Sequence, residues 1–441
     1  MYPKIIKGKL YEYRSALSYI FLLLFFSAPF LKVNGEQLIL LDVLERKFVF
    51  FGVIFWPQDF YLFVLALLCF IVFIVLFTVV FGRVFCGWIC PQTIFMEMVF
   101  RKVEFWIEGD HLQQRKLDEG PLTKEKFFKK TIKHAVFLLI SFCIANIFLA
   151  YVIGTNDWEK IIREPIQLHW IGFISISLFT LAFYLVYSKV RELVCTVFCP
   201  YGRLQGVLLD NQSIVVAYDH KRGEPRAKRL KDTLSDNGDC IDCKLCVQVC
   251  PTGIDIRNGT QIECINCTAC IDACDMVMEK IHKPIRLIGF KSEDEIMLGK
   301  PSKPRGKAYG YAGVFLMLLS LLIFLLSSRS AVKTTILRAS GTLYQIREND
   351  KTVSNLYNAE MTNKSSKPLI FEIVPVERNV KIQYIQKLNK LPYGGSTKIT
   401  FFVILPLQSI KKFKSKIKFK LISAGRVIDE FESTFIAPPN N

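Results

Sequence analysis

One stretch decides the fold: Cys240-Ile-Asp-Cys243-Lys-Leu-Cys246-Val-Gln-Val-Cys250-Pro251, followed after a short spacer by Cys264-Ile-Asn-Cys267-Thr-Ala-Cys270-Ile-Asp-Ala-Cys274. Both halves have the spacing C-x2-C-x2-C-x3-C. Three cysteines on so tight a loop can hold one face of a [4Fe–4S] cube, and the fourth ligand of each cube comes from the other half. The spacing therefore predicts two clusters.

The expected ligand sets cross between the two halves. One set is Cys240, Cys243, Cys246 and Cys274, and the other is Cys264, Cys267, Cys270 and Cys250. Zinc sites usually space two cysteine pairs farther apart and often include histidine, whereas no histidine lies between the first and last of these cysteines. A disulfide framework needs an oxidising compartment, and the topology predicted below argues against one for this segment.

Composition indicates a membrane protein with several domains. The 441 residues leave room for about three domains. Apolar residues make up 51% of the chain, which is high for a soluble protein and points to membrane spans. The net charge of +18 could indicate nucleic-acid binding. In a chain with several spans it more often reflects basic cytoplasmic loops, so no nucleic-acid partner is predicted.

Five apolar segments predict five transmembrane helices. They cover residues 16–31, 61–82, 135–153, 170–188 and 309–328. Lysine and arginine are concentrated in the N-terminus and in the loops that follow the second and fourth segments, whereas the 154–169 loop has few. By the positive-inside rule, the N-terminus and the cysteine-rich segment are cytoplasmic, and residues 329–441 lie on the far side of the membrane.

A second cysteine pattern occurs twice. Cys86-Gly-Trp-Ile-Cys90-Pro91 follows the second apolar segment, and Cys195-Thr-Val-Phe-Cys199-Pro200 follows the fourth. Both copies are therefore expected at the cytoplasmic membrane face, with the two cysteines of each copy on one side of a helical turn. Four thiolates favour soft metal ions such as Cu(I), zinc or iron. A dithiol/disulfide relay and a cluster shared between the two copies are the other interpretations. Cys86, Cys90, Cys195 and Cys199 are the candidate catalytic residues.

The C-terminal segment, residues 329–441, contains no cysteine. Apolar and charged side chains alternate in places, as in Lys416-Ile-Lys-Phe-Lys-Leu-Ile, with turn-forming Tyr393-Gly-Gly and Ser423-Ala-Gly between such runs. Short strands at this spacing predict a small antiparallel β-sandwich. No catalytic combination of residues occurs there, so a docking or structural role is expected.

Several motifs resemble the FixG/RdxA/CcoG family of cytochrome oxidase accessory proteins. They include Cys86-Gly-Trp-Ile-Cys-Pro-Gln-Thr93, Cys199-Pro-Tyr-Gly-Arg-Leu-Gln205 and Cys250-Pro-Thr-Gly-Ile-Asp-Ile-Arg257. Asp275 stands after Cys274 in place of the proline of simple ferredoxins, but that proline is no ligand. The resemblance implies a bacterial inner-membrane protein that reduces Cu(II) to Cu(I) for the maturation of cbb3-type cytochrome c oxidase.

Motifs and resemblance together predict a multi-domain membrane protein. It combines a five-helix transmembrane bundle, an inserted ferredoxin-like α+β domain with two [4Fe–4S] clusters, and a C-terminal immunoglobulin-like β-sandwich. The predicted domains are a cytoplasmic N-terminus (1–15), a four-helix region with both CxxxCP motifs (16–204), a cytoplasmic ferredoxin domain with basic linkers (205–308), a fifth transmembrane helix (309–328) and a periplasmic immunoglobulin-like domain (329–441).

The resemblance also implies partners. They are the lipid bilayer, the subunits of a cbb3-type oxidase or a copper chaperone or transporter, and an unknown cytoplasmic electron donor. Copper is the implied substrate metal. Two other functions stay open: a quinol dehydrogenase that exchanges electrons with a periplasmic partner, as related membrane polyferredoxins do, and a non-enzymatic scaffold for oxidase assembly.

Overall fold

The structure, a computed structural model, describes residues 2–33, 35–43, 46–56, 59–227, 237–299, 306–330, 332–339, 341, 343–347, 351–364, 368–385, 390–392, 394–410, 412–423 and 425–438. The chain forms two compact units, each described by itself. The first comprises Met1–Leu31, Leu40–Val43 and Phe63–Leu321, and the second comprises Lys32–Ile39, Leu44–Leu62 and Leu322–Asn441. Tyr393 and Ala424, in two of the predicted turns, lie outside the described residues.

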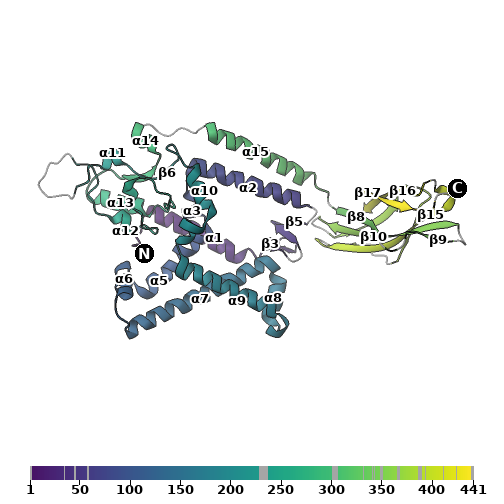
Figure 1. Ribbon diagram of the computed structural model, residues 1–441, viewed down its shortest axis with the longest axis horizontal. Helices are drawn as coiled ribbons and strands as arrows, with labels where there is room; N and C mark the ends of the chain where they lie inside the picture. The colour runs from purple at the N-terminus through teal and green to yellow at the C-terminus, as the bar shows by residue number, and fades with distance from the viewer. Residues whose placement is uncertain are drawn as a thin grey trace. The chain divides into compact units, whose positions relative to one another are not determined.

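Among the described residues, four helices are long and apolar enough to cross a membrane (Figure 1). They are α2 (Phe60–Phe81), α7 (Lys124–Ile153), α9 (Trp170–Leu185) with its π-helical continuation η4 (Val186–Val190), and α15 (Gly306–Ser327). These helices correspond to the second to fifth predicted spans. Their length and composition suit the apolar core of a bilayer, as expected of a membrane protein.

The first predicted span lies in α1 (Lys9–Ser27), which begins at Lys9 rather than at residue 16. Its first turns contain Lys9, Glu12 and Arg14, and α1 is not among the described helices that are long and apolar enough to cross a membrane. The predicted count of five transmembrane helices is therefore not confirmed. The charges suit the place where α1 begins, because Arg14 is buried and donates from Nε to the carbonyl oxygen of Gly87 (2.7 Å).

The region that carries the CxxxCP motifs is built from short helices with two π-helical turns. After the first motif the chain runs through α4 (Pro91–Ile94), η2 (Phe95–Phe100) and α5 (Arg101–Glu108). The second motif lies at the junction of η5 (Val194–Phe198) and α10 (Pro200–Leu208). Buried aromatic rings hold these helices to α7 and η4: Phe100 stacks on Tyr187 at 4.4 Å between centroids and meets Phe137 edge-on at 4.9 Å.

The cysteine-rich segment forms a small α+β fold in the same unit. Strand β6 (Val215–Tyr218) pairs antiparallel with β7 (Ile288–Lys291), and the short helix α12 (Leu245–Gln248) and the longer α13 (Ala269–Lys280) complete the fold. One buried core joins these elements, and it includes Val216, Cys246, Ile271, Met278 and Leu287. The apolar residues between the cysteines thus hold the two cysteine loops in place.

The second unit contains the predicted β-sandwich. One sheet has the strand order β13 (Lys381–Tyr384), β15 (Ser396–Pro406), β10 (Thr352–Asn363) and β8 (Val332–Arg338), with β9 (Gln345–Arg347) also paired to β10. The other has the order β12 (Glu372–Pro375), β16 (Lys414–Ser423) and β17 (Arg426–Ile436). Tyr357, Phe401 and Phe419 are fully buried in one core. Along β16, Ile417, Phe419 and Leu421 face this core and alternate with lysines, as the sequence pattern predicts.

Candidate metal centre

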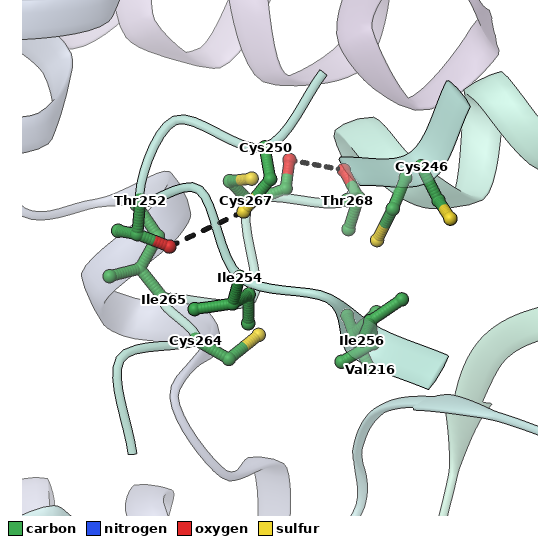
Figure 2. Close-up of a pocket in the computed structure, with 11 residues that line it drawn as sticks. Val216, Cys246, Cys250, Thr252, Ile254, Ile256, Cys264, Ile265, Cys267 and Thr268 are labelled. Carbon is green, nitrogen blue, oxygen red and sulfur yellow. Dashed lines mark hydrogen bonds between the residues drawn. The ribbon is translucent and has the colours of Figure 1, made fainter. Parts of the chain in front are cut away.

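Two pockets in the cysteine-rich fold are each lined by four cysteines. A pocket with about 360 Å³ of empty space is lined by Cys240, Cys243, Cys246 and Cys274, here called the distal set. A second pocket, of about 350 Å³, is lined by Cys250, Cys264, Cys267 and Cys270, here called the proximal set, with Cys246 at its edge (Figure 2). The structure therefore brings together the two crossed sets of cysteines that the spacing predicts.

The backbone of the two loops has the same unusual conformation on each side of the middle cysteine. Asp242 (φ 50°) and Lys244 (φ 54°) flank Cys243, while Asn266 (φ 53°) and Thr268 (φ 64°) flank Cys267. A positive φ is uncommon outside glycine, and Asp and Asn tolerate it best. These left-handed residues curl each loop so that its three thiols face one pocket, and the third cysteine then enters α12 or α13.

Both pockets are chemically suited to hold a cationic group. Burial raises the pKa of Cys246 to about 11 and that of Cys274 to about 12 in the distal set, and the neighbouring thiols add to both shifts. In the proximal set, burial raises the pKa of Cys264 to about 12 and that of Cys267 to about 11. Thiols so far from water stay protonated on their own, whereas bound iron removes the proton outright.

Unsatisfied donors next to the proximal set support the same assignment. Asn266 Nδ2 and Arg83 Nε are buried and have no hydrogen-bond partner among the described residues. A buried donor without a partner is costly, so an acceptor is expected there. The sulfur atoms of an iron–sulfur cluster are acceptors of this kind, and the residues of both sets fit [4Fe–4S] clusters.

The two CxxxCP motifs have the same local backbone structure. In each, the second cysteine is the N-cap of a helix whose first residue is the proline, at Pro91 and at Pro200. The backbone N–H of Cys90 reaches back to the Phe85 carbonyl oxygen (2.9 Å), and that of Cys199 to the Val194 carbonyl oxygen (2.7 Å). Proline is tolerated at this first position because its missing N–H would have no helical partner there.

The two motifs also come near each other, since Cys90, Cys195 and Cys199 all act electrostatically on Cys86, and these four cysteines are here called the CxxxCP set. Burial raises the pKa of Cys86 to about 12, and the other three thiols raise it further. Burial raises the pKa of Cys195 to about 11. Next to the set, Gln92 Nε2 and Thr93 Oγ1 are buried without a hydrogen-bond partner among the described residues.

The proximal set and the CxxxCP set are in direct backbone contact. Gly87, inside the first CxxxCP motif, lies so close to the loop between Cys264 and Cys267 that a Cβ atom on it would be 2.5 Å from the Ile265 carbonyl oxygen. Arg83 binds both sides of this junction, because its guanidinium donates to the carbonyl oxygens of Ile262 and Gly202. The two sites are therefore neighbours in space, although Cys199 and Cys250, the nearest cysteines of the two sets along the chain, are 51 positions apart.

A further cavity, with about 290 Å³ of empty space, lies beside this junction. Its lining comes from both cysteine regions and includes Gln92, Thr93, Met96, Glu97, Arg191, Glu192, Cys195, Pro251 and Thr252. Arg101, which is buried, forms ion pairs with Glu97 (3.0 Å) and Glu192. Among the described residues, no three His, Cys, Asp or Glu side chains are close enough together to hold a single metal ion.

Sequence reasoning did not find several residues of this junction. Arg14, Arg83, Gly87 and Gln205 were not among the predicted site residues, yet Cys86 Sγ donates to Gln205 Oε1 (3.0 Å). Gly87 and Gln205 lie within motifs that carry the family resemblance, and Arg83 is a charged residue directly after a long apolar segment, but no local pattern gives them a role in this junction.

Comparison with known proteins agrees with this arrangement. Residues 190–293 match the family described as "4Fe-4S dicluster domain", residues 62–109 match "4Fe-4S binding domain", and residues 322–438 match "IG-like fold at C-terminal of FixG, putative oxidoreductase". The second of these matches contains the first CxxxCP motif.

Three curated proteins are similar over long alignments. Protein RdxB of Cereibacter sphaeroides is 34% identical over 391 residues, which cover 85% of this chain and 81% of RdxB. Protein RdxA of the same organism is 33% identical over 353 residues, which cover 77% of this chain and 73% of RdxA. Nitrogen fixation protein FixG of Rhizobium meliloti is 36% identical over 301 residues, which cover 66% of this chain but only 56% of FixG.

Proposed function

Because the chain belongs to the FixG/RdxA/RdxB family of iron–sulfur electron-transfer proteins, we propose that it reduces Cu(II) to Cu(I) at the CxxxCP set. The distal and proximal sets would each hold one [4Fe–4S] cluster. When bound, these clusters supply single-electron storage and transfer, and each Cu(II) ion takes up one electron from a cytoplasmic donor. The Cu(I) product would serve the maturation of the copper centre of a cbb3-type cytochrome c oxidase.

The observation that carries the proposal is the contact between the proximal set and the CxxxCP set. Gly87 allows the backbone of the first CxxxCP motif to touch the Ile265–Asn266 backbone, and Arg83 bridges the two regions. The chain thereby provides a short covalent and hydrogen-bonded route between two groups of thiols. A donor site and an acceptor site in such contact are what electron transfer through the protein requires.

The chemistry of the CxxxCP set favours the reduced form of copper. Thiolates and thioethers are soft ligands that prefer Cu(I), so a site built from them stabilises the product of the reduction. All four cysteines are partly shielded from water, which raises the pKa of Cys86 and of Cys195, and a bound cation would offset that effect.

The test is an anaerobic single-turnover assay. The purified protein is reduced with dithionite, freed of excess reductant and mixed with Cu(II), while cluster absorbance and a Cu(I)-specific chelator are followed together. We expect clusters to be reoxidised in step with the appearance of Cu(I). Double substitution Cys86→Ser/Cys90→Ser is expected to slow Cu(I) formation at least tenfold while the iron content of the distal and proximal sets is retained. Clusters that stay reduced in the presence of Cu(II) would contradict the proposal.

The cavity beside Cys195 supports a second candidate, oxidation of a quinol. Gln92, Thr93 and Glu97 line it and offer hydrogen-bonding groups for a quinol headgroup. Quinol-dependent cluster reduction in membrane vesicles without copper would favour this function over copper reduction.

The match of residues 62–109 to a 4Fe-4S binding domain also supports another arrangement, in which the two CxxxCP motifs share one cluster. Iron and sulfide analysis separates the two arrangements. A protein whose iron content fits three clusters rather than two would move the CxxxCP set from substrate binding to cofactor binding.

A further inference from the structure

The two cysteine sets of the ferredoxin fold differ in the charges around them. Two buried arginines lie on the side of the proximal set, and both donate to backbone carbonyl oxygens. Arg14 binds the Gly87 carbonyl oxygen at 2.7 Å, and Arg83 binds those of Ile262 and Gly202. Carbonyl oxygens carry only partial negative charge, so each guanidinium keeps most of its positive charge in a region poor in water.

Both arginines lie beside the loop that carries the proximal set. Arg83 binds the carbonyl oxygen of Ile262, two residues before Cys264, and Arg14 binds that of Gly87, which lies against the Ile265–Asn266 backbone. Glu97 is a carboxylate near this loop, because it lines the same cavity as Ile265. It forms an ion pair with Arg101 at 3.0 Å, which compensates its charge. Asp272, two residues after Cys270, is a buried carboxylate that accepts from backbone N–H groups of α1, so against two arginines the surroundings of the proximal set remain positive on balance.

The distal set has a buried arginine too, but two carboxylates pair with it. Arg257 binds Asp242 at 2.5 Å and Asp255 at 2.7 Å. Asp275, which follows Cys274 directly, pairs with Arg286 at 3.4 Å, so its charge is compensated. Two carboxylates therefore share one buried arginine, and the charges of these described residues are negative on balance at the distal set.

The distal set is also more exposed to solvent than the proximal set. Cys243 of the distal set is exposed, whereas its counterpart Cys267 in the proximal set is buried. The residues that follow them differ accordingly: Lys244 is exposed and Thr268 is buried. A protein that donates electrons from solution thus reaches the distal set, while the proximal set touches the CxxxCP set through Gly87.

We propose that Arg14 and Arg83 give the proximal set the higher reduction potential, so that electrons enter at the exposed distal set and move toward the CxxxCP set. Reduction adds one negative charge to a [4Fe–4S] cluster, and a nearby uncompensated cation stabilises that charge. One electron leaves the distal set and one arrives at the proximal set, with no proton or co-reactant required. Arg14 and Arg83 are positioning residues, and the inference rests on the cluster assignment of the proposed function but not on its substrate.

The first test uses the unmodified protein without copper. A redox titration followed by electron paramagnetic resonance is expected to resolve two midpoint potentials. A dysprosium chelate in the buffer, which speeds the relaxation of exposed paramagnetic centres, should act more strongly on the signal of lower potential, because Cys243 is exposed. If the relaxed signal is the one of higher potential, or if the two potentials coincide, the proposal is overturned.

The second test uses variants with matched controls. Arg83→Gln is expected to lower the higher midpoint potential and leave the lower one unchanged, whereas Arg83→Lys, which keeps the charge, should restore most of the difference. Arg257→Gln, at the equivalent buried position of the distal set, should lower only the other potential. A variant Arg83→Gln with intact clusters and unchanged potentials, or with both potentials shifted equally, would overturn the assignment. If the two potentials are as expected but copper is not reduced, only the proposed substrate is contradicted, and the direction of electron flow proposed here stands.

Discussion

Gly87 shows how much can depend on one missing side chain. A Cβ atom there would lie 2.5 Å from the Ile265 carbonyl oxygen and 2.9 Å from the Asn266 backbone, distances that require the two loops to move apart. Backbone atoms cannot yield as the end of a flexible side chain can. The contact between the proximal set and the CxxxCP set therefore depends on glycine at this position.

Substitution Gly87→Ala is expected to slow electron transfer from the reduced protein to Cu(II) at least tenfold. Overpacking of this kind costs about 1–3 kcal/mol of stability, so both clusters should still assemble. Rapid-mixing absorbance measures the rate, and iron analysis measures cluster content. The control is Gly289→Ala in β7, where the nearest atom would be 3.8 Å from the new Cβ. An unchanged rate in Gly87→Ala would show that this contact does not carry the electrons.

Among the elements, α1 depends on a residue that lies far away in the sequence. Its N-cap is Gly8, which has no side chain to accept the first N–H groups of the helix. Asp272 in α13 accepts them instead, from Leu10 N (3.2 Å) and Tyr11 N (2.8 Å). Gly8 also leaves room for this carboxylate, because a Cβ atom on it would collide with the Asp272 side chain. A carboxylate at a helix N-terminus satisfies free donors and complements the helix dipole.

Removal of this cap in Asp272→Ala is expected to destabilise the start of α1 by about 0.5–2 kcal/mol. Hydrogen exchange of the backbone amides of residues 9–14 should become faster, while exchange in β6 and β7 stays the same. Asp275→Ala is the matched control on the same helix, because Asp275 accepts from Arg286 N rather than from α1. Equal exchange rates in Asp272→Ala and the unmodified protein would show that α1 does not need the cap.

At the scale of the whole molecule, a buried ion cluster holds the second unit together. Asp59 precedes α2, and it pairs with Arg329 and with Lys364, whose Nζ lies 2.5 Å from Asp59 Oδ1. Asp59 and Lys364 are each only 4% exposed. Residues distant in sequence are joined here, and Asp59 is the carboxylate that both cations share.

Substitution Asp59→Asn leaves two buried cations without their carboxylate and is expected to destabilise the second unit by about 3–5 kcal/mol. Thermal unfolding of the full chain, with limited proteolysis to follow the second unit, measures the effect. Lys416→Gln provides the control, because the pair Lys416–Glu432 is mostly exposed and such pairs contribute about 0–1 kcal/mol. A loss no larger than that of the control would mean that the cluster does not stabilise the unit.

Local periodicity let the sequence predict a large part of the fold and of the site. Cysteine spacing predicts the crossed distal and proximal sets because the ligands of a cluster lie a few residues apart on one loop. Long apolar segments predict α2, α7, α9 and α15, since a span needs uninterrupted apolar surface. The alternation along β16 predicts the buried positions Ile417, Phe419 and Leu421, because side chains in a strand point to opposite faces in turn.

The sequence by itself thus determined which cysteines belong together and which segments are helices or strands. Only the tertiary structure decided that Arg14, Arg83, Gly87 and Asp272 connect these parts. Their partners lie between 73 and 262 residues away along the chain. No local period records such a contact, because it arises where two backbones approach each other after folding. The beginning of α1 differs from its prediction for the same reason: its charged first turns are stabilised by Asp272 and Gly87, which hydropathy along the chain does not reveal.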